Sequence, residues 1–163
     1  MGRGIRLGSE SFLLNSPIAI ASIKADINID MIGRNGTDEI TVAPARVEGA
    51  MYDLTKNARL LANKMKLELT AEADQYWMRS DHYNFFKRGI PAVFFFSGMH
   101  EDYHQKSDTP DKINFEKMGK IASLTRDLIL ETANAPTAPN PISKEDWSAW
   151  VWPAEKVRKS PSR

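Results

Sequence analysis

The chain has 163 residues, of which 42% are hydrophobic and 26% are charged, a balance typical of one compact globular domain. The formal net charge of +1 gives no strong field for attracting nucleic acid or an anionic membrane, so we expect neither as a partner. No apolar run approaches the roughly 20 residues of a membrane span. Cysteine is absent, which excludes disulfides and thiolate chemistry and leaves His82, His100, His104 and the carboxylates for metal or acid–base work.

The first half of the chain predicts a helix, two strands and a second helix. Residues 8–15 are typical of a short helix that ends before a proline, and residues 23–32 have apolar side chains at period two, as a strand does. A turn at 34–38 leads to a second strand at 39–43. Apolar residues then recur at helical spacing, which predicts an amphipathic helix over 49–66.

The second half predicts a short strand at 67–70, a short helix with Ser80 as its N-cap, and a strand at 92–97. The run of phenylalanines in the strand 92–97 favours burial on both of its faces. Asn114 is expected to cap a final helix. The apolar face of that helix consists of Phe115, Met118, Ile121, Leu124 and Leu128.

The alternation of strands and helices predicts an α/β fold, with a sheet between layers of helices. Prolines cluster from about residue 135, so we expect a packed domain over 1–134 and a tail over 135–163. The tail contains Trp147, Trp150 and Trp152, which either pack on the domain or form a patch for a partner.

Two polar features stand beyond the carboxyl ends of expected strands, where α/β sheets collect their ligands. Asp30 interrupts an apolar run near the end of the strand 23–32 and is either a water-facing strand-end residue or a cation ligand. His104 lies in the loop after the strand 92–97. That loop holds two histidines and three acids within nine residues, which indicates either a metal or acid–base loop or a solvated polar loop.

The tripeptide Ser80-Asp81-His82 contains the residue types of a hydrolase triad. Adjacent residues do not converge as triad members do. A helix start explains them better, because the helix dipole favours an acid such as Asp81 there.

Three ordered segments resemble motifs of the dinuclear zinc aminopeptidases of metallopeptidase family 28. Residues 28–34, N-I-D-M-I-G-R, resemble that family's N-L-D-M-I-G-R strand end. Residues 79–96 are similar to its S-D-H…G-I-P helix and the strand that follows. Residues 100–114 resemble its H-E-D-Y-H…S-D-T…D-K-I-N loop. The resemblance runs from about residue 4 to residue 130.

The resemblance implies that the chain is the C-terminal portion of a three-layer α/β/α fold, with a partial mixed sheet and flanking helices. It also implies two zinc ions that share a bridging aspartate and activate a water, which removes N-terminal residues from peptides. By this resemblance Asp30 is a terminal ligand of one zinc and His104 a terminal ligand of the other.

Five further residues match positions around the family's site. Asp81, Tyr103 and Asp108 match groups that support the ligands or face the substrate. Met31 and Arg34 match positions that border the substrate pocket.

Other parts of the family's site have no counterpart in the sequence. The family's first histidine ligand and its bridging aspartate lie upstream of the matched segments, and a pair of glutamates precedes a G-L-L-G-S helix. Residues 4–9, G-I-R-L-G-S, match that helix, so the pair would fall at residues 1–3, where no residue is acidic. A catalytic zinc needs about three protein ligands and an open water position. We therefore expect weak or absent zinc, no catalytic residue and no hydrolysis by this chain alone.

A fold without its upstream strands would expose a sheet edge, and exposed edges invite pairing. We expect self-association or a complementing chain, and a peptide substrate only where the site is completed. The leading prediction is the C-terminal part of an aminopeptidase-like zinc metallopeptidase. One alternative is a non-catalytic dimerising or partner-binding module on the same fold. Another is a new metal-dependent hydrolase that recruits His82, His100, Glu101 or Asp102.

Overall fold

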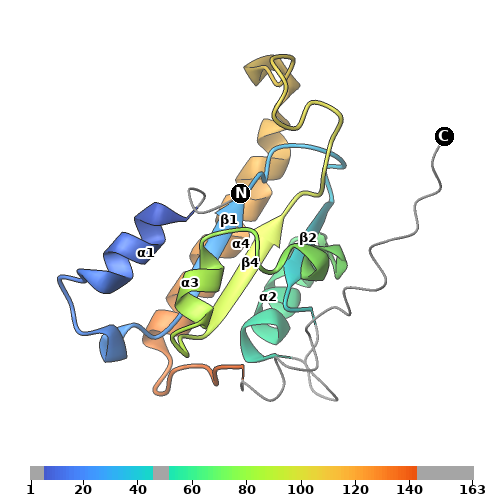
Figure 1. Cartoon of the computed structure of the whole chain (residues 1–163). Coiled ribbons are helices and arrows are strands. Elements are labelled where there is room, and N and C mark those ends of the chain that lie inside the picture. Colours follow the sequence, from blue (N-terminus) through green and yellow to red (C-terminus); the bar gives the residue numbers. More distant parts are fainter. Residues whose placement is uncertain (1–5, 46–51, 143–163) are drawn as a thin grey trace, which may run out of the picture.

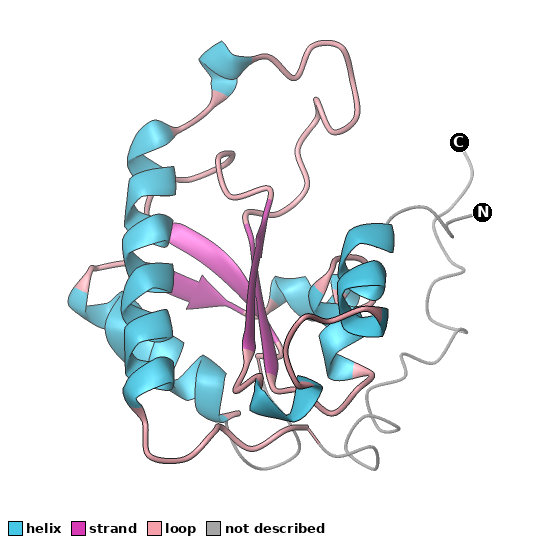
Figure 2. Ribbon diagram, turned by 90° about the vertical axis from the view of Figure 1, so that its left-hand side faces the viewer, coloured by secondary structure: helices cyan, strands magenta, loops and turns pink. Residues whose placement is uncertain are grey.

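The computed structural model describes residues 6–45 and 52–142, which form a mixed four-stranded sheet with helices on both faces (Figures 1 and 2). This arrangement confirms the predicted α/β fold with a partial mixed sheet and flanking helices. None of the helices in the described ranges is long and apolar enough to cross a membrane.

The four strands lie in the order β1 (Asp26–Asp30), β4 (Ala92–Phe96), β2 (Glu39–Ala43) and β3 (Glu68–Thr70). β1 runs parallel to β4, β2 runs antiparallel to β4, and β3 runs parallel to β2. Among the described strands β1 therefore has a neighbour on one side only, and it forms an edge of the sheet.

β4 lies inside the sheet between β1 and β2, and all five of its residues are buried, as its phenylalanine run predicts. Val93 and Phe95 point into the core on one face of the sheet. Phe94 and Phe96 point into a second core on the other face. Because apolar side chains of β4 point to both faces of the sheet, each face needs a covering layer of helices.

One layer consists of α2 (Asp53–Lys64) and α4 (Phe115–Asn134), which pack against each other and against the sheet. Ile121, Leu124 and Leu128 of α4 are fully buried, as their spacing predicts. The prediction is wrong for Phe115, which is 67% exposed, because it stands at the first helical position and extends beyond the core.

The other face carries α3 (His82–Phe86) and α1 (Leu7–Leu14), which contact each other. Three short 3-10 helices complete the described segments: Ile20–Ser22, Glu72–Tyr76 and Pro110–Lys112. In Figure 1 α1 lies on the open side of β1.

Two local expectations fail for identifiable reasons. β1 is shorter than the expected 23–32, because a 3-10 turn precedes it and Met31 takes a left-handed conformation (φ 54°) directly after it. Ser80 is not the N-cap of α3: Asp81 holds that position without a side-chain cap, and the Ser80 hydroxyl donates to Asp30 instead. The expected cap at Asn114 is confirmed, because its side chain accepts from the Lys117 amide at 2.9 Å.

The segment after α4 continues along the domain to the end of the described residues. α4 ends at Asn134, and Ile142 packs against both cores. The division of the chain at residue 134 stays a prediction, and Trp147, Trp150 and Trp152 lie outside the described residues.

Candidate metal site

The candidate site lies where two parallel strands end side by side. Asp30 is the last residue of β1 and stands in register with Phe96, the last residue of β4. His104 belongs to the loop that leaves β4. Because parallel strands present their carboxyl ends at the same edge, the sheet brings these two residues to one place.

Asp30 and His104 line the same pocket, whose volume is about 370 Å³. Of the seven residues predicted for the site, the pocket also includes Met31, Tyr103 and Asp108. The remaining lining residues are Tyr76, Arg79, Ser80, Phe94, Phe96 and Met99. The pocket therefore combines an aromatic wall with a few polar groups, as small-ligand sites commonly do.

A chain of hydrogen bonds fixes the Asp30 carboxylate. The Ser80 hydroxyl donates to Asp30 Oδ2 at 2.8 Å and accepts from Asn28 Nδ2 at 2.9 Å. Asn28 Nδ2 also lies 3.3 Å from Nδ1 of His82. Nε2 of His82 lies 2.6 Å from the Trp77 carbonyl oxygen and donates to it in the tautomer with the proton on Nε2.

His82 lies at the buried end of this series of hydrogen bonds. Burial lowers the pKa of His82 to about 3, so the ring is neutral at ordinary pH. The ring stacks on Phe94 with centroids 4.5 Å apart and lies 4.4 Å from the Trp77 ring. His82 is fully buried and does not line the pocket, which argues against its recruitment as a ligand.

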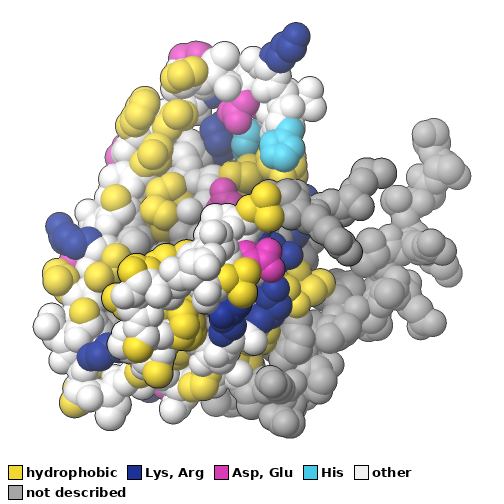
Figure 3. Space-filling view, turned by 60° about the vertical axis from the view of Figure 1, so that its left-hand side comes forward, with side chains coloured by type: hydrophobic (Ala, Val, Ile, Leu, Met, Phe, Trp, Pro, Cys, Tyr) yellow, Lys and Arg dark blue, Asp and Glu magenta, His cyan; other side chains and the backbone are white. Residues whose placement is uncertain are grey.

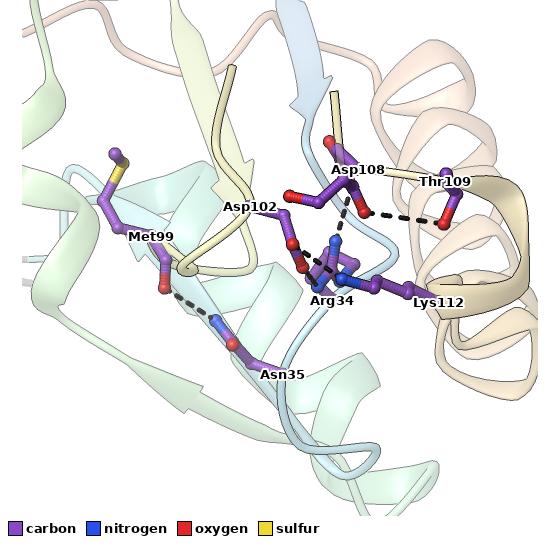
Figure 4. Close-up of polar contacts among 8 residues, drawn as sticks. Arg34, Asn35, Met99, Asp102, Asp108, Thr109 and Lys112 are labelled. Atoms are coloured by element: carbon purple, nitrogen blue, oxygen red, sulfur yellow. Dashed lines mark hydrogen bonds and ion pairs between the residues drawn. The ribbon is translucent and has the colours of Figure 1, made fainter. Parts of the chain in front are cut away.

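Asp81 and Arg34 lie outside the pocket lining. Asp81 accepts a hydrogen bond from the Ser9 hydroxyl and so ties α3 to α1. Arg34 forms ion pairs with Asp102 and Asp108, at 2.5 Å each (Figure 4). The side chain of Asp102 is held by Arg34 and by Lys112, whose Nζ is 2.6 Å away.

Two of the pocket residues have unusual backbone conformations. Met31 (φ 54°) and His104 (φ 58°) both occupy the left-handed region, which is uncommon for residues other than glycine. Such conformations persist where the surrounding contacts fix them, and they cluster at functional sites. Met31 lies on the segment that follows β1, and His104 lies on the segment that follows β4. The backbone conformation of both segments therefore depends on the contacts that surround them.

The side chains present do not by themselves fit a catalytic zinc. A zinc in such a site takes three protein ligands and keeps one position open. Within residues 6–45 and 52–142 there is no group of three or more histidine, aspartate and glutamate side chains that could hold a metal ion. Asp30 and His104 are two candidate ligands, and further ligands would have to come from elsewhere.

The sequence-based prediction did not include Ser80, which donates to Asp30, or Asn28, which donates to Ser80. The segment D-I-N-I-D of β1 carried a signal for Asn28, because residues two apart in a strand share a face. No sequence pattern connects Ser80 with Asp30, which is fifty positions away. That contact depends on where α3 packs against β1.

The fold and the site together define an α/β protein whose polar groups meet beyond the carboxyl ends of two parallel strands. A family model described as peptidase family M28 matches residues 5–129, and the chain belongs to that family.

Several solved aminopeptidase structures have a similar fold. The aminopeptidase from Aneurinibacillus sp. strain AM-1 is 23% identical, with a TM-score of 0.61 over 84% of this chain and 31% of that one. A zinc aminopeptidase from Bacillus subtilis is 20% identical, with a TM-score of 0.58 over 84% of this chain and 36% of that one. The LapA aminopeptidase of Legionella pneumophila is 21% identical, with a TM-score of 0.58 over 78% of this chain and 36% of that one. The chain thus spans about a third of each of these structures.

Proposed function

We propose that this chain is the C-terminal part of the catalytic domain of an aminopeptidase-like zinc metallopeptidase, and that it does not hydrolyse peptides by itself. The observation that supports this proposal best is the pocket shared by Asp30 and His104, at the carboxyl ends of neighbouring parallel strands. In a completed site, zinc would polarise the scissile carbonyl and activate a water.

The residues of this chain would bind and orient. Asp30 would give a carboxylate ligand that Ser80 holds in place, since hydrogen bonds of this kind orient ligands and tune their basicity. His104 would give an imidazole ligand from the loop that follows β4. The aromatic residues of the pocket, Tyr76, Phe94 and Phe96, would form an apolar wall against a peptide. None of these groups supplies the general base that hydrolysis requires.

A further segment or a complementing chain would supply the missing ligands and the base. We propose that this segment or chain joins the sheet at the edge of β1. Ile29 on β1 is 43% exposed and Ile129 on α4 is 47% exposed. A groove of about 470 Å³ follows the start of β1 and the end of α4. The carboxyl oxygen Oδ2 of Asp26 and the hydroxyl of Thr132 are buried there without a partner among the described residues.

Figure 3 turns the α1 side of the molecule forward and shows apolar side chains gathered on it. A sheet edge with apolar flanks and unpaired polar atoms pairs readily with another strand. The same edge favours the second candidate function, a non-catalytic module that binds a partner or a second copy of itself.

The test of the ligand assignment is a zinc titration by calorimetry together with an aminoacyl-anilide hydrolysis assay. For the chain alone we expect no turnover and no saturation in the micromolar range. Asp30→Asn and His104→Ala should each weaken the residual binding, whereas His100→Ala should not, because His100 lies in the same loop but does not line the pocket. Residual binding that is insensitive to both Asp30 and His104 would refute the assignment.

A further inference from the structure

The loop between β4 and α4 is held to the domain by ion pairs of a buried carboxylate and not by a buried apolar side chain. Among residues 98–112, Asp102 is the one buried residue, and His104 and its neighbours on the C-terminal side are exposed. A buried charge is stable only where it is paired and hydrogen-bonded. The conformation of this loop therefore depends on the groups that hold Asp102.

Arg34 holds the loop at two points that flank His104. NH2 of Arg34 binds Asp102 Oδ2 and NH1 binds Asp108 Oδ1, each at 2.5 Å (Figure 4). The guanidinium group can do this because its donors form a rigid fork, whereas a lysine offers a single charged nitrogen. His104 lies between the two clamped carboxylates in the sequence.

Arg34 is itself fixed by the segment that follows β1. Nζ of the buried Lys117 donates to the Arg34 carbonyl at 2.8 Å. The next residue, Asn35, donates to the carbonyls of Ser97 and Met99 at 2.8 and 3.2 Å. The backbone of Arg34 is therefore held in place by hydrogen bonds. Its guanidinium group can in turn fix the position of the loop relative to β1.

We infer that Arg34 is a positioning residue that fixes the His104 loop relative to Asp30, by clamping Asp102 and Asp108 with one guanidinium group. The conformation of His104 (φ 58°) is the kind that surrounding contacts must maintain. Without the fork, Lys112 alone of the two cations still holds Asp102, so the loop loosens and His104 loses its fixed position in the pocket. This role concerns the order of the loop and holds whether or not metal binds; only its consequence for metal affinity rests on the proposed function.

The test is hydrogen exchange of the loop amides in the purified chain, by mass spectrometry or NMR. The reporters are the amides of Gln105 and Asp108, which donate to the carbonyls of Asp102 and Gln105 at 2.8 and 3.2 Å. Arg34→Lys keeps the charge and loses the fork, and we expect exchange in the loop to become at least about tenfold faster, the effect of losing one charge-assisted hydrogen bond. Exchange in β4 and α2 should not change.

Two companion variants separate the clamp from a general loss of stability. Lys120→Met removes two other ion pairs, with Asp38 and Glu116, and should leave loop exchange unchanged. Asp108→Ala removes the acceptor of the bond from Arg34 NH1 and should also accelerate exchange in the loop. Its combination with Arg34→Lys should add less than the sum of the two single effects, because both remove the same contact.

Loop exchange in Arg34→Lys that matches the wild type, or an acceleration spread evenly over the whole chain, would overturn the inference. Zinc titration of the same variants gives a separate readout. A loosened loop with unchanged zinc affinity would support the role of Arg34 and contradict the assignment of His104 as a ligand.

Discussion

At the scale of single residues, the informative feature is the polar face of β1, where Asp26, Asn28 and Asp30 alternate with isoleucines. The Ser80 hydroxyl accepts a hydrogen bond from Asn28 and donates one to Asp30. We expect Ser80→Ala to lower the free energy of unfolding by about 1–2 kcal/mol, because it removes two hydrogen bonds of a buried hydroxyl. Urea denaturation measures this loss.

Ser97 provides the matched control for Ser80. It is equally buried, but its hydroxyl has no hydrogen-bond partner among the described residues. Ser97→Ala should therefore be close to neutral or stabilising. Equal losses for the two serines would show that the contact between Ser80 and Asp30 contributes nothing.

Asp26 and His82 give opposite pH dependences. Burial raises the pKa of Asp26 to about 7, with a smaller contribution from the charge of Asp81. The folded state therefore holds this proton longer than the unfolded state, and stability falls as pH rises from about 4 to about 7. Burial lowers the pKa of His82 to about 3, so its contribution to stability rises with pH from about 3 to about 6.5.

Replacing Asp26 should separate the two effects. At about pH 8.5 we expect Asp26→Asn to be more stable than the wild type by about 2–4 kcal/mol, because it removes a buried charge. At about pH 4 the difference should largely vanish, because Asp26 is then protonated. The variant should also gain stability with pH between about 4 and 6, at up to about 1.4 kcal/mol per pH unit, because His82 is already neutral in the folded state while the unfolded chain still binds its proton. Denaturant titrations at several pH values measure these differences, and a constant offset at all pH values would contradict the assignment.

At the scale of elements, the N-cap of α4 is a feature that the local sequence predicts and the structure contains. The Asn114 side chain accepts from the Lys117 amide and donates to the Thr37 hydroxyl at 2.7 Å. Asn114→Ala should cost about 1 kcal/mol of stability, the usual value of an N-cap. Asn114→Asp keeps the acceptor and should retain most of it, whereas Asn134→Ala at the exposed end of α4 should have little effect. Thermal unfolding distinguishes these outcomes.

The elements that the sequence predicts well are those with a long or simple pattern. The apolar spacing of α4 and the phenylalanine run of β4 correspond to buried faces in the structure. The predicted strand 23–32 is longer than β1, because the left-handed residue that ends the strand is Met31, an apolar residue that continues the period-two pattern. The partners of Asp30 and Arg34 were missed because contacts between residues fifty or more positions apart depend on packing that a sequence pattern does not contain.

At the scale of the whole molecule, the relevant feature is that β1 forms an edge of the described sheet. Because Ile29 is exposed on that edge, we expect the purified chain to self-associate at micromolar concentration through strand pairing. Ile29→Lys should shift it toward the monomer, since charged residues protect sheet edges. Leu60→Lys, at an exposed position on α2, should not. Light scattering after size exclusion gives the mass, and a monomeric wild type would contradict the prediction.

The central claim is that Asp30 and His104 are the ligands that this chain contributes to an otherwise incomplete zinc site. The most direct test measures bound zinc in the purified chain after dialysis, alongside hydrolysis of an aminoacyl-anilide. Our proposal predicts substoichiometric zinc that both Asp30→Asn and His104→Ala reduce further, and no turnover above the buffer. Tightly bound zinc at two ions per chain, with turnover in the absence of any other polypeptide, would contradict it.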